Sequence, residues 1–100
     1  MSVTGIKYAV VTRDLKRYCY FMSGSLRFDE KVAKRSAVSD TVEGARRLVA
    51  RAQAYRDSDI KQYQNHLNIN SHYAAHYQRM IDELTDLDFT IVEISVKEVE

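Results

Sequence analysis

The scarcity of residues that interrupt regular structure constrains this chain most. Its 100 residues include no proline and only three glycines, at positions 5, 24 and 44. Since proline and glycine are the residues that most often mark turns and linkers, we expect little loop and no interdomain linker. The length is ordinary for one domain, and we predict a single domain over residues 1–100.

Composition excludes several classes of protein. Hydrophobic residues make up 45% of the chain and the net charge is +1, whereas disordered chains are less apolar and more lopsided in charge. No apolar run is long enough to cross a membrane, and the charges on Lys7, Arg13 and Asp14 argue against a secretory signal. The single cysteine, Cys19, excludes an internal disulfide framework and favours the reducing cytoplasm.

Three segments have the composition of β-strands. Residues 5–13 and 16–22 are rich in β-branched and aromatic side chains, and the short segment Asp14-Leu15 between them suits a hairpin turn. Residues 89–97 are the most strand-like, and their apolar start on both faces indicates cover on both sides. We expect residues 26–38 to be mostly irregular, although Leu26 and Phe28 alternate as in a strand.

Two helices are predicted. Asp40 and Glu43 form a capping-box pattern before an apolar stripe that runs to Tyr55, and this first helix should stop near residues 57–59. Gly44 lowers the helix propensity, which a close approach to another backbone would explain. The amide-rich residues 60–70 allow two helical turns and then a break. The second helix should run from a Ser71 cap to residues 86–88.

The predicted order of elements is ββααβ. It corresponds to an α+β fold in which a three-stranded sheet carries two helices on one face. The first and last strands are the most apolar, and we expect them to be neighbours. The second face and both edges of such a sheet are exposed, so we expect a homodimer that packs through the uncovered sheet face or the last helix.

Charge is distributed unevenly along the chain. Residues 1–56 hold twelve basic and five acidic residues, a net of +7, whereas residues 57–100 hold three and nine, a net of −6. If folding interleaves the two halves, this asymmetry is internal complementarity. Otherwise it creates a dipolar surface that steers a charged partner.

Two candidate contact surfaces follow from this pattern. Five residues are candidates for binding a partner protein, namely Tyr18, Tyr20, Asp82, Glu83 and Asp86. The alternative is direct RNA or DNA binding by Arg46, Arg47 and Arg51, which lie on the first helix away from its apolar stripe. The alternative is less favoured because nucleic-acid binders of this size are usually clearly basic.

The sequence shows no catalytic or metal-binding pattern. His72 and His76 are four apart and would share a helix face, but a closed zinc site needs four ligands, so we expect no metal and no cofactor. If these histidines lie in an interface, protonation at about pH 6 would weaken it. Cys19 lies between two tyrosines in a strand and is expected to be a buried, inert thiol. The chain is also short to enclose a pocket of the size of a small-molecule site, and we predict no enzyme.

The layout resembles that of a class of small phage-encoded accessory proteins. The resemblance rests on residues 7–11 (KYAVV), 17–21 (RYCYF) and 26–28 (LRF), on the Asp40-x-x-Glu43-x-Ala45 helix start, and on the closing strand 89–94 (FTIVEI). The amide-rich residues 60–70 and the second long helix depart from the shorter versions. No site residue is carried over from the class. The resemblance implies that the protein binds one host factor, often a defence or expression component, and blocks it stoichiometrically. Anti-defence proteins, including anti-CRISPR proteins, are often of this size.

Together, the residues and the resemblance predict a non-enzymatic binding protein in the host cytoplasm. Its expected partner is a host protein of defence or of nucleic-acid handling, which it inhibits or modulates through a surface contact, with no role for a membrane.

Overall fold

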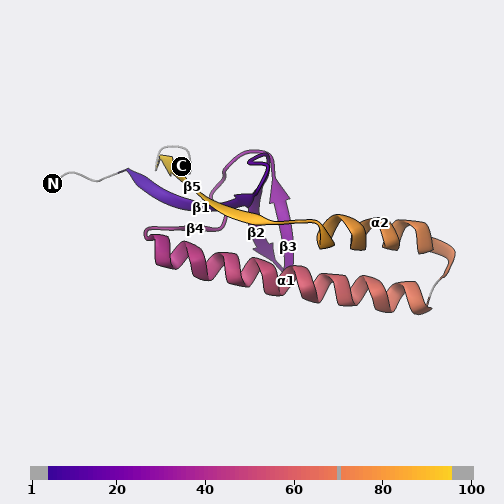
Figure 1. The fold of residues 1–100 in the computed structure, drawn as a ribbon. Helices are drawn as coiled ribbons and strands as arrows, with labels where there is room; N and C mark the ends of the chain where they lie inside the picture. Colours follow the sequence, from indigo (N-terminus) through magenta and orange to yellow (C-terminus); the bar gives the residue numbers. More distant parts are fainter. Residues whose placement is uncertain (1–4, 70, 96–100) are drawn as a thin grey trace.

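The computed structural model describes residues 5–69 and 71–95, which form an α+β fold with a five-stranded antiparallel sheet (Figure 1). In chain order the elements are β1 (Ile6–Thr12), β2 (Tyr18–Met22), β3 (Ser25–Asp29), β4 (Val38–Ser39), α1 (Val42–Ile69), the 3₁₀ turn η1 (Ser71–Tyr73), α2 (Ala74–Thr85) and β5 (Phe89–Ser95). The predicted α+β class is confirmed. The predicted three-stranded sheet is wrong, because β3 and β4 also belong to the sheet.

β1 is the central strand of the sheet. β5 pairs antiparallel with all of residues 6–12 of β1 and so occupies one edge of that strand along its whole length. β2 and β4 share the other edge, through the pairs Val11↔Tyr18 and Ala9↔Val38. The expectation that the first and last strands are neighbours is therefore confirmed.

β3 and β4 are the strands that the sequence did not predict. A two-residue turn joins β2 to β3, and its Ser23 and Gly24 have φ values of 54° and 76°. Two positive φ values are typical of a type I′ turn, whose twist matches that of the flanking strands, and the alternation of Leu26 and Phe28 continues as β3. β4 has only two residues, so its pairing with β1 defines it as a strand. Between β3 and β4, residues 30–37 are mostly irregular, as expected.

α1 is one continuous helix over residues 42–69, so the expected stop near residues 57–59 is wrong. Asp59 is buried, and its carboxylate accepts hydrogen bonds from the backbone N–H of Leu26 (3.3 Å) and the hydroxyl of Ser25 (3.4 Å). These contacts join the helix to β3. Because no proline or glycine lies between residues 45 and 69, nothing in the sequence of this stretch forces a break.

The N-cap of α1 is Thr41 and not Asp40. The hydroxyl of Thr41 accepts a hydrogen bond from the backbone N–H of Gly44 (3.0 Å), as an N-cap side chain does. Asp40 instead pairs with the ammonium group of Lys7 at 2.8 Å. The predicted capping box of Asp40 and Glu43 is therefore wrong by one residue, since the helix begins later.

Gly44 allows α1 to pack closely against β4. A Cβ atom at position 44 would lie 2.0 Å from Oγ of Ser39, and 3.0 Å from both Cβ of Ser39 and Oγ1 of Thr41. The position is closely packed, but the nearest atoms belong to side chains, so the expected close approach to another backbone is wrong.

In a helix without tertiary contacts, alanine is more favourable than glycine by about 1 kcal/mol. We nevertheless expect Gly44→Ala to lower the free energy of unfolding of this protein by about 1 to 2 kcal/mol. The added methyl group displaces the hydroxyl of Ser39, which accepts the backbone N–H of Thr41 at 3.3 Å, and crowds the capping hydroxyl. Urea denaturation of Gly44→Ala, Ser39→Ala and the double variant measures the effect. The double variant should recover about half of the loss, and a stabilised single variant would contradict the packing argument.

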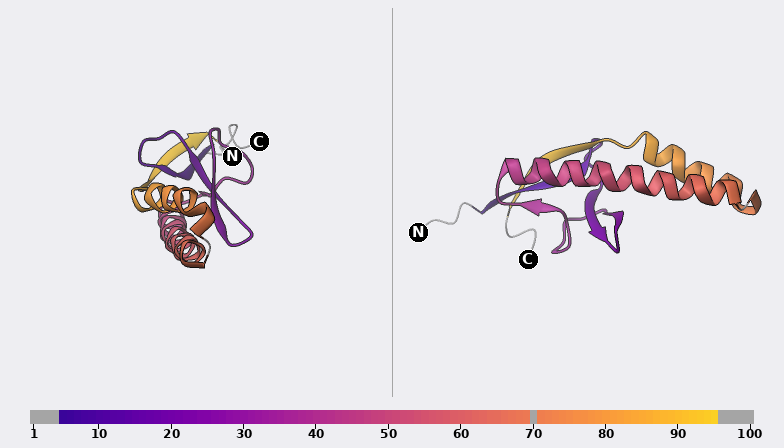
Figure 2. Two further views of the ribbon diagram at one scale, coloured as in Figure 1. Left: turned by 90° about the vertical axis from the view of Figure 1, so that its right-hand side faces the viewer. Right: turned by 90° about the horizontal axis from the view of Figure 1, so that it is seen from below.

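α1 extends along the molecule, with the sheet beside its N-terminal part and α2 beside its C-terminal part (Figures 1 and 2). The part made by the two helices, residues 60–69 and 71–81, is called the arm. Both helices were expected to cover one sheet face, but only α1 does so, because α2 packs mainly against α1.

The core lies between α1 and the sheet. The residues at its centre are Val10, Cys19, Leu26, Ala37, Ala52 and Phe89, and Leu48, Val49 and Tyr55 of the predicted helical stripe pack against them. Ala9 and Val11, which point to the opposite face of β1, are also buried. Since the chain covers both faces of its central strand, the open sheet face that suggested a homodimer does not exist at β1.

Candidate functional site

A groove lies where the β1–β2 turn faces the end of α2. It has a volume of about 850 Å³ and is open to solvent. The residues that line this turn groove are Thr12, Arg13, Asp14, Arg17, Phe28, Met80, Glu83, Leu84, Asp86, Leu87 and Asp88. Its volume is that of many small-molecule sites. The groove is open and not enclosed, so it does not contradict the expectation that the chain is short to enclose a pocket of that size.

The β1–β2 turn forms one wall of the turn groove. The hydroxyl of Thr12 donates a hydrogen bond to the carboxylate of Asp14, and the backbone N–H of Lys16 donates another at 3.0 Å. These two hydrogen bonds lower the pKa of Asp14 below its ordinary value, the Thr12 bond contributing most. Asp14 thus remains ionised and serves to close the turn.

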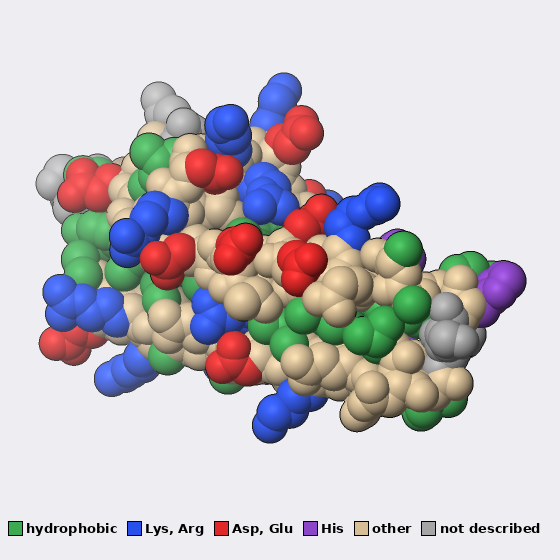
Figure 3. Space-filling model, turned by 45° about the vertical axis from the view of Figure 1, so that its right-hand side comes forward, with side chains coloured by type: hydrophobic (Ala, Val, Ile, Leu, Met, Phe, Trp, Pro, Cys, Tyr) green, Lys and Arg blue, Asp and Glu red, His purple; other side chains and the backbone are tan. Residues whose placement is uncertain are grey.

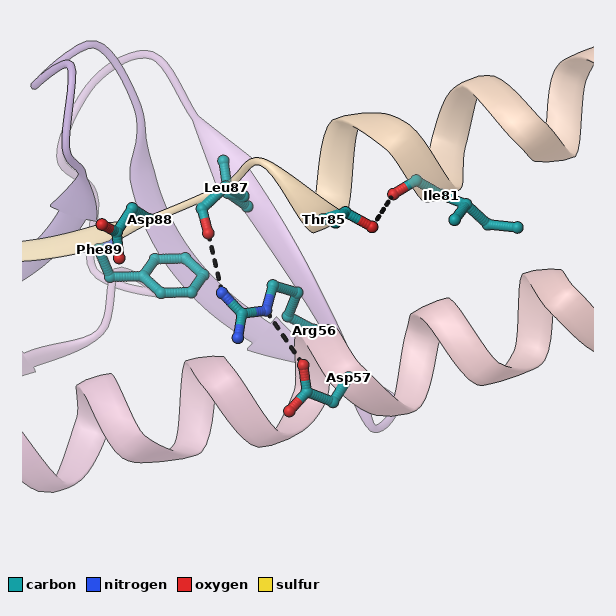
Figure 4. A network of polar contacts seen from close by, with 7 residues as sticks. All are labelled: Arg56, Asp57, Ile81, Thr85, Leu87, Asp88 and Phe89. Carbon is teal, nitrogen blue, oxygen red and sulfur yellow. Dashed lines mark hydrogen bonds and ion pairs between the residues drawn. The ribbon is translucent and has the colours of Figure 1, made fainter.

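The linker between α2 and β5 forms the opposite wall. Arg56 of α1 donates a hydrogen bond from Nη1 to the carbonyl oxygen of Leu87 (2.8 Å), and its Nε binds the carboxylate of Asp57 (3.2 Å) (Figure 4). Nearby, the hydroxyl of Thr85 donates to the carbonyl oxygen of Ile81 (2.7 Å) at the end of α2. The bond to Leu87 joins the linker to α1, and Leu87 lines the apolar floor of the groove with Phe28, Met80 and Leu84.

The charges on the rim of the turn groove are only partly paired. Nε of Arg13 lies 3.2 Å from the carboxylate of Asp88, and the guanidinium of Arg17 lies 4.8 Å from the ring centre of Phe28. Glu83 and Asp86 are exposed and form no ion pair with any residue that the structure describes. The groove therefore offers two available carboxylates beside an apolar floor.

These two carboxylates belong to the five predicted partner-binding residues. Asp82, a third member of that set, does not line the groove, and its carboxylate accepts a hydrogen bond from Nε2 of Gln78 (2.9 Å). Glu83 and Asp86, three residues apart at the end of α2, both line the groove, whereas Asp82 does not. The structure thus brings together part of the predicted acidic surface.

The two predicted tyrosines lie in β2, away from the lining of the groove. Tyr20 is only 8% exposed, and the guanidinium of Arg35 lies 4.2 Å from its ring centre. Nε and Nη2 of the same guanidinium donate hydrogen bonds of at most 2.8 Å to the carboxylate of Asp29. These hydrogen bonds lower the pKa of Asp29. Tyr20 is therefore an interior residue and no longer a contact candidate. Tyr18 is half-buried, and its role in binding stays a prediction.

The three arginines predicted to bind nucleic acid do not form one patch. Arg46 lies beside β5, where it lines a shallow hollow of about 310 Å³ with residues 89–91. The guanidinium of Arg51 lies 5.6 Å from the ring centre of Phe21 in β2, and Arg47, four residues earlier, shares its side of the helix. The arginines are thus divided between two flanks of α1.

All three histidines lie in the arm, among tyrosine rings. The ring centre of Tyr77 is 5.4 Å from that of His66 and 5.6 Å from that of His76, while His72 lies 4.9 Å from Tyr73. Within residues 5–69 and 71–95, no three histidine, cysteine or acidic side chains gather as they would around a metal ion.

Cys19 is a buried thiol in β2, as predicted. Burial raises its pKa to about 12, against a smaller opposite effect of Arg17. The thiolate is therefore scarce at neutral pH, and this side chain acts as a small core residue.

Comparison with known proteins finds no family model, no curated protein and no solved structure that matches the chain. None of the helices in the described part of the chain is long and apolar enough to cross a membrane. The turn groove is therefore interpreted from its own residues.

Proposed function

We propose that this protein is a non-enzymatic binding protein that holds a segment of a partner protein in the turn groove. The observation that carries the proposal is the pair of available carboxylates, Glu83 and Asp86, above an apolar floor that includes Phe28 and Leu87. A segment with both basic and apolar side chains satisfies the two features together, since apolar groups supply contact area and opposite charges supply orientation.

The open shape of the groove supports a macromolecular partner over a small molecule, which is usually held in a site that buries most of its surface. Proteins that handle nucleic acids expose basic side chains for phosphate groups. An acidic groove binds the same basic side chains that would otherwise contact phosphate groups. While the groove occupies these side chains, the partner cannot bind nucleic acid. This agrees with the role that the resemblance to phage-encoded accessory proteins implies, an inhibitor of a host protein.

We expect a fluorescent peptide of alternating arginine and leucine to bind the protein, and the Glu83→Lys/Asp86→Lys variant to bind it about 10- to 100-fold more weakly. The reversed charges repel the arginines while the apolar floor is unchanged. Fluorescence anisotropy at low salt measures the affinity, since screening weakens contacts between exposed charges. NMR amide shifts confined to residues around Phe28, Leu84 and Leu87 would locate the peptide in the groove.

Two controls make the test decisive. A peptide with glutamate in place of arginine should not bind, and the Arg47→Glu/Arg51→Glu variant should bind the arginine peptide as well as the unchanged protein does. Equal binding of both peptides, or no loss in the Glu83→Lys/Asp86→Lys variant, would contradict the proposal. Loss of RNA or DNA binding in the Arg47→Glu/Arg51→Glu variant would instead support the alternative of direct nucleic-acid binding.

A further inference from the structure

The end of the arm is a segment of the chain without charge. Residues 62–78 include no aspartate, glutamate, lysine or arginine, and Lys61 and Arg79 border the segment. Charged side chains crowd the sheet end of the molecule, whereas the right-hand end in Figure 3 is mostly uncharged. We refer to residues 62–69 and 71–78 as the tip.

The apolar side chains of the tip are incompletely covered by the arm. Tyr63, Leu67 and Tyr77 lie between the two helices and are only half-buried. Ile69 and Tyr73 are 84% and 56% exposed. Where α1 packs on the sheet, by contrast, Ala45 and Ala52 are fully buried. The tip therefore presents aromatic and aliphatic surface that the described residues leave open, which is a common feature of interaction sites.

We propose that the tip binds the tip of a second copy of this chain, so that two arms meet about a twofold axis. In such a contact, residues near the axis face their own copies, and a charged residue there would face a like charge. A surface that binds a different protein needs no such neutrality, because the partner can supply the opposite charge. The uncharged tip thus fits a self-contact, and this inference is independent of the turn groove.

Sedimentation velocity from about 5 to about 500 µM tests the proposal, because this range detects a dimer whose Kd is micromolar. At pH 7.5 the unchanged protein should show a monomer–dimer equilibrium. Ile69→Glu and, separately, Tyr73→Glu should weaken the dimer at least about tenfold, because each places like charges across the axis. Both positions are exposed, and far-UV circular dichroism checks that each variant is folded. Gln53→Glu adds the same charge to an exposed position of α1 outside the tip and should leave the dimer unchanged.

A mass of 11.6 kDa at every concentration would overturn the proposal, as would a dimer that resists both glutamate substitutions. If the Ile69→Glu variant still binds the peptide of arginine and leucine, the loss of the dimer concerns the tip alone and leaves the proposal for the turn groove unchanged.

Discussion

Iodoacetamide at pH 8 should alkylate Cys19 in the folded protein on the order of a thousandfold more slowly than in the unfolded chain. Burial raises the pKa of this thiol to about 12, so that only about one molecule in 10⁴ carries the reactive thiolate at pH 8. In the unfolded chain, a thiol of ordinary pKa is about one-tenth to one-quarter ionised. Mass spectrometry of timed samples, with and without guanidinium, measures both rates. Rates within tenfold of each other would show that the thiol is accessible in the folded state.

The same shift predicts how stability changes with pH. Below the unfolded-state pKa of about 8.5, the thiol is protonated in both states and contributes no pH dependence. As the pH rises from there toward 12, the unfolded chain loses the proton while the folded chain keeps it, so the free energy of unfolding falls by up to about 1.4 kcal/mol per pH unit. Cys19→Val, which keeps an apolar side chain of similar size, should lack this component when urea denaturation is repeated at pH 8, 9 and 10.

The burial of Cys19 was predictable because its signal is local. The β-branched and aromatic composition of three segments predicted β1, β2 and β5, and the apolar character of the first and last strands predicted that they pair. The end of α1 was not predictable in this way. Asp57, Ser58 and Asp59 have a composition typical of a helix end, but Asp59 accepts hydrogen bonds from Ser25 and Leu26, more than thirty residues away in sequence. A tertiary contact of this kind overrides a local signal that suggests the opposite.

The candidate site was predictable only in part for the same reason. Glu83 and Asp86 are three apart on a predicted helix, so their common side was visible in the sequence. Their position above Phe28 and opposite the β1–β2 turn depends on β3 and on the Arg56–Leu87 hydrogen bond, which join distant segments. Tyr20 illustrates the converse, since its aromatic type suggested a contact surface while the fold buries it beneath Arg35.

Phe89→Ala should be the most destabilising of the substitutions considered, with a loss of about 3 to 5 kcal/mol in the free energy of unfolding. Phe89 is 6% exposed and is the first residue of β5, where it packs in the core cluster with Val10 and Ala52. Its removal leaves a cavity between α1 and the sheet at the point where the chain passes from α2 to β5. For a domain of this size, the loss corresponds to a decrease in Tm of roughly 15 to 30 °C.

The surroundings of Phe89 explain why the cavity should not collapse. The guanidinium of Arg56 lies 5.8 Å from the ring centre and is held by the carbonyl oxygen of Leu87, so that this wall cannot move inward without breaking a hydrogen bond. Phe89→Leu, which refills most of the space, should cost less than about 1.5 kcal/mol. Leu15→Ala makes a similar truncation at a side chain that is 60% exposed and should cost less than about 0.5 kcal/mol. Urea denaturation of the three variants gives these values, and a loss below about 1 kcal/mol for Phe89→Ala would show that α1 and β5 do not depend on this contact.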